Sequence, residues 1–196
     1  LWNRMLYDWV PWMREHASEV AVRCEVGSPD RLTHDLLEGL LDLAVTYSPQ
    51  VRPGLKIQLI AEEELVMLEA ETPGQGRRKE YIYVDWGDEF RRRHHMEFPD
   101  SPSPALFIGL GTLGFAQLLR SGGSGYFPRG LARRHLKSGR VREVKGAASF
   151  VLPIYAAYGS GGDDELLGPA LRGLRQVVKS AVGQPVDRPV KARRPK

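Results

Sequence analysis

Short apolar runs of strand length alternate with helix-length amphipathic segments along most of this chain. Runs typical of strands occupy residues 19–26, 40–47, 54–61, 64–71, 80–86, 104–110, 125–128, 140–144 and 149–158. Apolar residues at helical spacing, or helix start and stop signals, occupy residues 1–16, 28–40, 87–96, 111–123, 129–139 and 163–182. A chain that alternates in this way is expected to fold as an α/β protein whose sheets are covered by helices.

The first of these alternations predicts a specific topology. Residues 19–26 (EVAVRCEV) alternate apolar and polar side chains, and residues 40–47 are apolar again. Between them, Ser28 is a good helix N-cap and Pro29 suits the first helical position. A strand, a helix and a strand in this order predict a parallel pair with a right-handed crossover. Cys24 lies inside the first run and is expected to be a small buried residue.

Two segments of loop composition divide the chain into lobes. Residues 72–79 and 144–148 bracket a middle block that has its own alternation of strands and helices. We therefore expect lobe I to consist of 1–66 and 149–182, with lobe II (67–148) inserted into it. Ligands of such folds bind beside the carboxyl ends of strands and the N-termini of helices, so a cleft between the lobes is the expected site.

The net charge of +4 resides in the last ten residues. Residues 187–196 contain five basic residues and one acidic residue, so the rest of the chain is neutral overall. A neutral body has no electrostatic footprint for DNA. The segment 183–196, which is rich in proline and basic residues, is expected to be a flexible, solvated tail.

Cysteine content and hydropathy predict the compartment. The single cysteine excludes an internal disulfide and a cysteine-based zinc cluster. The first residues, LWNRMLYDW, lack the pattern of a secretory leader, and no apolar run reaches the ~18–20 residues that span a bilayer. We expect a cytoplasmic protein with no membrane segment.

A glycine motif is the strongest candidate for cofactor binding. Residues 109–114 (GLGTLG) match G-x-G-x-x-G, follow an apolar strand and open a helix, as a dinucleotide fingerprint requires. About 20 residues further on, where that motif has a carboxylate for the ribose, the chain has Arg129, Arg133 and Arg134. A tight strand-to-helix turn is therefore the favoured interpretation, and a nucleotide-using enzyme is the weaker alternative.

Other catalytic and metal motifs find little support. The sequence has no G-x-S-x-G, no H-E-x-x-H and no Walker motif. In RRRHH (91–95), His94 and His95 are adjacent and would point about 100° apart on a helix, so they do not easily share a metal. We expect a solvated helix face there, and we expect no catalytic residue, no metal and no cofactor.

Two stretches of the chain resemble a known family. The run LLEGLLDLAVTY (36–47) followed by PGLKIQLIAEEELVMLEAE (53–71) is similar to the first lobe of the effector-binding domain of LysR-type transcriptional regulators. GGSGYFPRGLARRHLKSGRVREV (122–144) matches the family's glycine–aromatic–proline signature and the leucines that follow it. The resemblance covers about residues 1–180, with the spacing between the blocks preserved.

The resemblance implies a fold, a site and an activity. The fold is type 2 periplasmic-binding-protein-like, with two α/β lobes, and the activity is sensing of a small-molecule effector in the cleft between them. Hydroxyls and helix amides are expected from lobe I, and stacking aromatic faces from lobe II. Carried onto this chain, the effector-binding positions are Gly27, Ser28, Thr46, Tyr47, Asp85, Trp86, Gly87, Gly125 and Tyr126.

The resemblance also implies partners. We expect a homodimer or homotetramer in which the first helix of one protomer packs beside lobe II of its partner, with exposed members of Trp2, Trp9 and Trp12 at the contact. DNA is expected to be bound only through an N-terminal winged helix-turn-helix, which these residues do not include, and the family's first strand also precedes Leu1. The alternative function is a solute-binding receptor of a transport system with the same fold.

Overall fold

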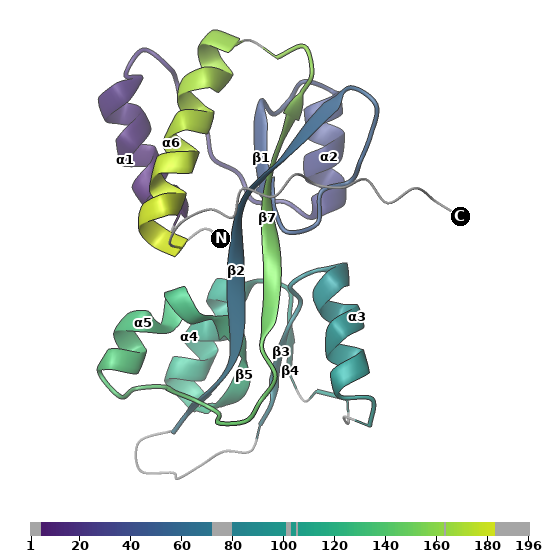
Figure 1. Cartoon of the computed structure of the whole chain (residues 1–196), viewed down its shortest axis with the longest axis vertical. Helices are drawn as coiled ribbons and strands as arrows, with labels where there is room; N and C mark the ends of the chain where they lie inside the picture. The colour runs from purple at the N-terminus through teal and green to yellow at the C-terminus, as the bar shows by residue number, and fades with distance from the viewer. Residues whose placement is uncertain (1–4, 72–79, 101–102, 105, 163, 183–196) are drawn as a thin grey trace. The chain divides into compact units, whose positions relative to one another are not determined.

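The computed structural model describes residues 5–71, 80–100, 103–104, 106–162 and 164–182, which fall into two units (Figure 1). Unit 1 consists of Met5–Glu62 and the segment that begins at Pro153, and unit 2 is Glu63–Leu152. The chain thus passes from one unit to the other within two strands, β2 (Leu55–Ala70) and β7 (Phe150–Gly159). No helix among the described residues has the length and hydropathy needed to cross a membrane.

Unit 1 is a small sheet with helices on both faces. Its elements are α1 (Tyr7–His16), α2 (Pro29–Leu37), β1 (Leu43–Thr46), α6 (Asp164–Val182) and the adjoining parts of β2 and β7. β1 pairs with β7 in antiparallel register, with Thr46 opposite Tyr155. α1 packs along α6, and α2 packs against β1 (Figure 1).

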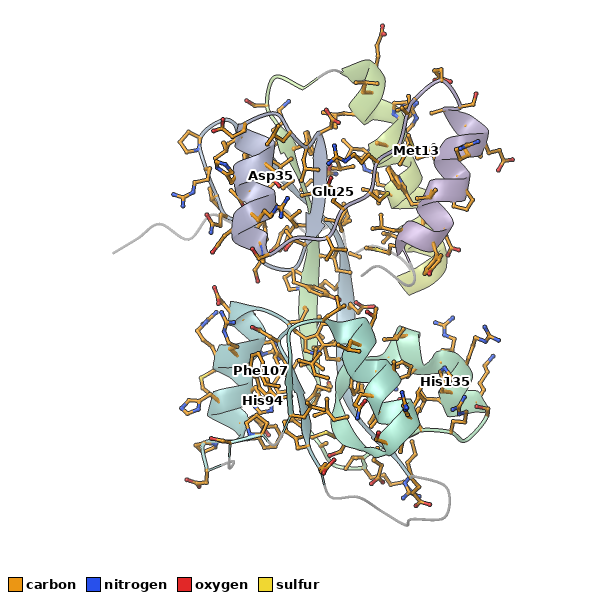
Figure 2. The ribbon with its side chains drawn as sticks, turned by 180° about the vertical axis from the view of Figure 1, so that it is seen from behind. Met13, Glu25, Asp35, His94, Phe107 and His135 are labelled. Atoms are coloured by element: carbon orange, nitrogen blue, oxygen red, sulfur yellow. The ribbon has the colours of Figure 1, made fainter. Side chains whose placement is uncertain are left out.

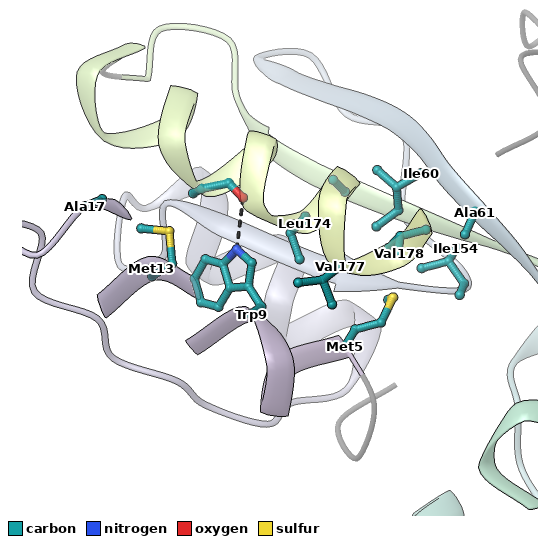
Figure 3. Packing of buried hydrophobic residues seen from close by; sticks show 12 residues of the cluster. Met5, Trp9, Met13, Ala17, Ile60, Ala61, Ile154, Leu174, Val177 and Val178 are labelled. Carbon is teal, nitrogen blue, oxygen red and sulfur yellow. Dashed lines mark hydrogen bonds between the residues drawn. The ribbon is translucent and has the colours of Figure 1, made fainter. Parts of the chain in front are cut away.

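The core of unit 1 is mostly aliphatic (Figure 3). Met5, just before α1, and Trp9 and Met13 on α1 follow one another at helical spacing and pack in one cluster with Leu174 and its neighbours on α6. The Trp9 indole N–H donates to the carbonyl oxygen of Ala170 at 2.9 Å, which fixes the two helices against each other. A much smaller cluster, built on Leu36, Ala44 and Ala157, lies under α2.

Unit 2 contains the remaining elements. They are β3 (Ile82–Val84), α3 (Asp88–Glu97), β4 (Leu106–Ile108), α4 (Gly111–Ser121), β5 (Gly123–Pro128), α5 (Arg129–Lys137) and β6 (Arg142–Glu143). β3 and β4 form a parallel pair, whereas β5 and β6 pair with β2 in antiparallel register. The larger sheet has the strand order β1-β7-β2-β5, with β6 also on β2.

The core of unit 2 is aromatic. Phe90, Tyr126, Phe127 and Phe150 are all nearly inaccessible to solvent. Phe90 makes edge contacts with both Tyr126 and Phe150, at centroid distances of 5.9 and 5.2 Å. Edge-to-face packing of this kind is favourable beyond the area that it buries.

Three local predictions are wrong. Residues 19–26 form no strand: Val20 and Val22 pack on the core of unit 1, so the alternation is satisfied by packing without a sheet ladder. The parallel pair is therefore not formed, and β1 pairs instead with the distant β7. Residues 54–61 and 64–71 belong to one strand, β2, because the acidic residues between them continue the extended chain rather than turning it.

The prediction for Cys24 is also wrong, because the structure places this free cysteine on the surface. The run that contains it packs only Val20 and Val22 against the core, and its polar alternates remain in solvent. The loop expected at 72–79 and the tail expected at 183–196 lie outside the described residues.

Candidate functional site

Unit 1 contributes the start of α2. Ser28 is the N-cap of this helix, and its hydroxyl oxygen accepts a hydrogen bond from the Arg31 backbone N–H at 3.3 Å. Pro29 occupies the first turn, as the sequence predicts. Gly27, just before the cap, lies close enough to Leu32 that a Cβ there would stand 3.2 Å from its side chain. The Ser28 side chain is exposed, so its hydroxyl is open to a ligand while it caps the helix.

The end of β1 supplies the second pair of predicted residues. Thr46 is the last residue of the strand and is buried, with its hydroxyl oxygen accepting the Ser48 backbone N–H at 3.2 Å. Tyr47 follows it, half-buried against the core of unit 1. Because α2 packs on β1, both pairs of residues belong to the same helix–strand layer of this unit.

In unit 2, the turn between β3 and α3 is held by a carboxylate. Asp85 accepts the backbone N–H of Gly87 at 2.9 Å and the Arg91 guanidinium at 2.5 Å. Gly87 has φ of 101°, a conformation that glycine adopts easily and other residues rarely do. Asp85 therefore helps to shape the turn, and its charge raises the pKa of Arg91.

The N-termini of α3 and α4 lack a side-chain cap, as does that of α5. α3 begins after Gly87 and α4 begins after Leu110, and neither N-cap residue has a side chain that accepts a hydrogen bond from the first turn. The strands that precede them, β3 and β4, are parallel neighbours, so the two helix starts share one edge of the sheet. Uncapped N–H groups with the positive end of the helix dipole are suited to a carboxylate or another anion at α4, whose first turn has no acidic residue, whereas Asp88 and Glu89 already place negative charge in the first turn of α3.

The Trp86 ring is part of the core of unit 2. Its exposed fraction is 7%, its indole N–H donates to the Tyr126 carbonyl oxygen at 3.0 Å, and it meets the Phe127 ring edge-on. A Cβ at Gly111 would collide with the indole, so this glycine is what lets the start of α4 approach Trp86. The ring therefore does not present the open stacking face expected from its position.

Tyr126 is buried even more deeply. Its ring packs against Phe90, Phe98 and Phe150, and its hydroxyl donates to the Ala148 carbonyl oxygen at 3.0 Å. Burial raises the pKa of Tyr126 to about 12. Gly125 precedes it on β5, and a Cβ there would stand 2.7 Å from the Ile82 carbonyl oxygen. The structure thus gives both residues a packing role that the stacking interpretation did not foresee.

His94 contradicts the expected solvated helix face. It is buried within unit 2, on the inner side of α3 (Figure 2). Its neighbour His95 is exposed. The Nε2 of His94 lies 2.7 Å from the Tyr81 hydroxyl, and the His94 ring is surrounded by further aromatic rings, Tyr83 and Phe98 among them. Burial, and secondarily the charge of His95, lower the pKa of His94. The signal that was missed is the i, i+4 series Phe90, His94, Phe98.

The glycine motif is explained by helix packing. At Gly114 a Cβ would stand 2.6 Å from a Val84 methyl group, and at Gly111 it would collide with Trp86, whereas at Gly109 it would meet nothing. Gly111 and Gly114 are therefore required for α4 to approach Trp86 and the end of β3 closely. This is the tight strand-to-helix turn that the sequence favoured over dinucleotide binding.

The tryptophans proposed for a dimer contact differ in availability. Trp9 is buried against α6 and is not available to a partner. Trp12 is half-buried and stacks on His16 with a centroid distance of 4.4 Å, and its Nε1 is a buried donor with no acceptor among the described residues. Trp2 lies outside the described residues.

Comparison with known proteins identifies relatives of both sequence and fold. A family model described as "LysR substrate binding domain" matches residues 1–98. The regulatory domain of HypT from Salmonella typhimurium, in its apo form, is similar at a TM-score of 0.73 and 14% identity, over 92% of this chain and 93% of that one. The comparison with curated proteins gave no match.

Two longer regulators share the same fold. Full-length LysG from Corynebacterium glutamicum with bound effector Arg has a TM-score of 0.66 at 16% identity, over 90% of this chain and 66% of that one. Full-length CbnR complexed with its target DNA has a TM-score of 0.64 at 15% identity, over 90% and 67%. The chain therefore spans about two thirds of each of these regulators. These findings confirm the predicted type 2 periplasmic-binding-protein-like fold.

Proposed function

Because the chain belongs to the LysR substrate-binding domain family, we propose that it is the sensor of a DNA-binding transcriptional regulator and that a small-molecule effector is its ligand. The match over residues 1–98 is the observation that carries the proposal. The family consists of regulatory effector-binding domains of transcription factors, so the transport-receptor alternative is not favoured. We also propose that this chain catalyses no reaction and that the protein is cytoplasmic.

The effector contacts proposed in unit 1 are polar. Ser28 and Thr46 offer hydroxyl oxygens, Gly27 offers backbone, and Tyr47 offers a ring that is half-exposed. Each hydroxyl accepts one hydrogen bond within the unit and can donate its own proton to an acceptor on the effector. This chemistry favours an effector that carries an oxygen acceptor such as a carboxylate.

The contacts proposed in unit 2 are backbone amides more than side chains. The proposed positions remain Asp85, Trp86, Gly87, Gly125 and Tyr126. The rings of Trp86 and Tyr126 are buried and hydrogen-bonded within the unit, so we propose that these two residues hold the backbone of the site in place and do not stack on the effector. The uncapped start of α4, whose first turn has no acidic residue, supplies N–H donors. An anionic effector is therefore the proposal that these residues support best.

A thermal-shift screen of metabolite carboxylates tests the proposal. A ligand present at ~100 times its dissociation constant stabilises the domain by about 2.7 kcal/mol. Once a ligand is found, Thr46→Val should weaken its binding at least tenfold, because the shape is kept and the hydroxyl is lost. Thr33→Val is the matched control, since the Thr33 hydroxyl is buried and donates to the Pro29 carbonyl oxygen. Equal losses in both variants would remove Thr46 from the site.

The proposed output is a change in assembly. We expect a homodimer or homotetramer, with DNA bound through an N-terminal module like that of the full-length regulators. Trp12 is the remaining described candidate among the tryptophans for the protomer contact. Light scattering at tens of micromolar, with and without effector, checks this: a monomer under both conditions would contradict it.

A further inference from the structure

A pocket at one end of unit 1 is not used by the proposed effector site. It encloses about 310 Å³ and is lined by the C-terminal end of α2, the turn before β1, the start of β2 and the loop from β7 into α6. Ser28 caps the opposite end of α2, and a helix of nine residues is about 13 Å long. The pocket and the proposed effector contacts of this unit are therefore separated by the length of that helix.

The walls of the pocket are leucines that the fold leaves incompletely covered. Leu36 and Leu167 are buried at its floor, while Leu37 and Leu166 keep 47% and 41% of their surface exposed. The core cluster beneath α2 contains only Leu36, Ala44 and Ala157 as fully buried residues. This face of the sheet is thus thinly packed, and apolar surface remains for a ligand to cover.

Glycines at the rim have no structural explanation. Gly159 and Gly161 have ordinary φ values, and a Cβ at either position would meet nothing within 4 Å. Neither backbone conformation nor close packing therefore requires glycine there, unlike Gly111 or Gly114 in unit 2. Missing side chains at these two positions keep the mouth of the pocket open.

The charge at the pocket has one sign. Among the described residues that line it, Asp42 is the single charged side chain; it is exposed and forms no ion pair with any described residue. The C-terminal end of α2 adds the negative end of a helix dipole. α6 begins beside the pocket with a positive end, and Glu165 in its first turn offsets that charge. A cation is the complementary ligand.

We propose that this pocket is a second small-molecule site of the domain, which takes a compact apolar ligand bearing a positively charged amine. The apolar body replaces water against Leu37, Leu41 and Leu166, and the ammonium group lies at the Asp42 carboxylate. The volume lies at the lower limit of typical ligand pockets, so the ligand is of fragment size. This site does not depend on the proposed effector site and takes a ligand of opposite charge.

The test uses 2-phenylethylamine as the probe and 3-phenylpropanoate as its anionic counterpart, each titrated to about 10 mM against the whole chain. In ¹H–¹⁵N correlation spectra, the amine should shift the amides of Gly39, Gly54 and Gly161 in a saturable way, and the carboxylate should not. Shifts confined to unit 2, equal shifts of these three amides with the two probes, or no saturable shift would each overturn the proposal.

Variants locate the binding. Gly161→Leu should abolish it by filling the mouth, and Asp42→Asn should weaken it about three- to tenfold because one exposed charge contact is lost. Gly109→Ala, at another glycine with open space, and Asp100→Asn, at another exposed carboxylate, should leave it unchanged. Unaltered amine binding in both pocket variants would place the ligand elsewhere. If Gly161→Leu fails to fold, the affinity of Asp42→Asn and the amide shifts of the wild type still test whether the amine binds in this pocket.

Discussion

The two units hold their candidate residues in opposite ways. In unit 1, Ser28 and Tyr47 lie at or near the surface, and the core that supports them is aliphatic and formed elsewhere, between α1 and α6. In unit 2, Trp86 and Tyr126 are themselves core residues: the Trp86 indole N–H donates to the Tyr126 carbonyl oxygen, and both rings pack among other aromatic rings. Recognition and folding are therefore separable in unit 1 and coupled in unit 2, so substitutions in the two units should have different costs.

The largest expected effect is at Tyr126. Tyr126→Ala should lower the free energy of unfolding by about 3–5 kcal/mol, as for other fully buried aromatic side chains. Tyr47→Ala, on a half-buried ring in unit 1, should lower it by about 1–2 kcal/mol. Urea denaturation, with hydrogen exchange to locate the loss, measures both. Equal losses of unfolding free energy in the two variants would contradict the difference in packing that we describe between the units.

The glycines at the start of α4 should show the next largest effect. Gly111→Ala forces a methyl group into the Trp86 indole and should destabilise the protein by about 1–3 kcal/mol. Gly109→Ala, in the same turn but with open space, should stay within about 0.5 kcal/mol. Thermal unfolding of the pair measures the difference. If Gly111→Ala were neutral, close packing would not be the reason for that glycine.

A smaller effect is expected at the helix cap of unit 1. Ser28→Ala removes the acceptor for the Arg31 N–H and should cost about 1 kcal/mol of stability. Ser28→Asn should retain most of it, because asparagine caps helices as well as serine does. An effector that uses the hydroxyl would still bind the asparagine variant more weakly. Stability and affinity measured on the same two variants separate the two roles, and a loss of stability in both would reject the cap.

The smallest expected effect is a pH dependence located in unit 2. Burial lowers the pKa of His94 in the folded chain below its ordinary 6.5, so the unfolded chain binds more protons in that range. Stability should therefore fall as the pH drops below about 6.5. His94→Phe should flatten this slope, and His95→Gln, at the exposed neighbour, should not. Melting temperatures between pH 7.5 and pH 5 provide the measurement, and an unchanged slope in His94→Phe would count against the buried imidazole.

Much of the architecture follows from local patterns. Helical spacing located α1 and α6, the Ser28–Pro29 signal located the start of α2, and the alternation of elements gave the fold class. The pattern failed at 19–26, where alternating side chains pack without a paired strand. Periodicity reports which side chains face the core, but it does not report whether another strand lies alongside.

The candidate positions were predicted from the sequence alone, through the resemblance, and they remain proposals. What only the tertiary structure decided is what each side chain is free to do. Trp86 and His94 look like exposed functional groups in the sequence, yet both are enclosed by residues far away along the chain. The physical reason is that burial depends on contacts between distant segments, such as Trp86 with Tyr126 and His94 with Phe150, and no local pattern specifies those contacts.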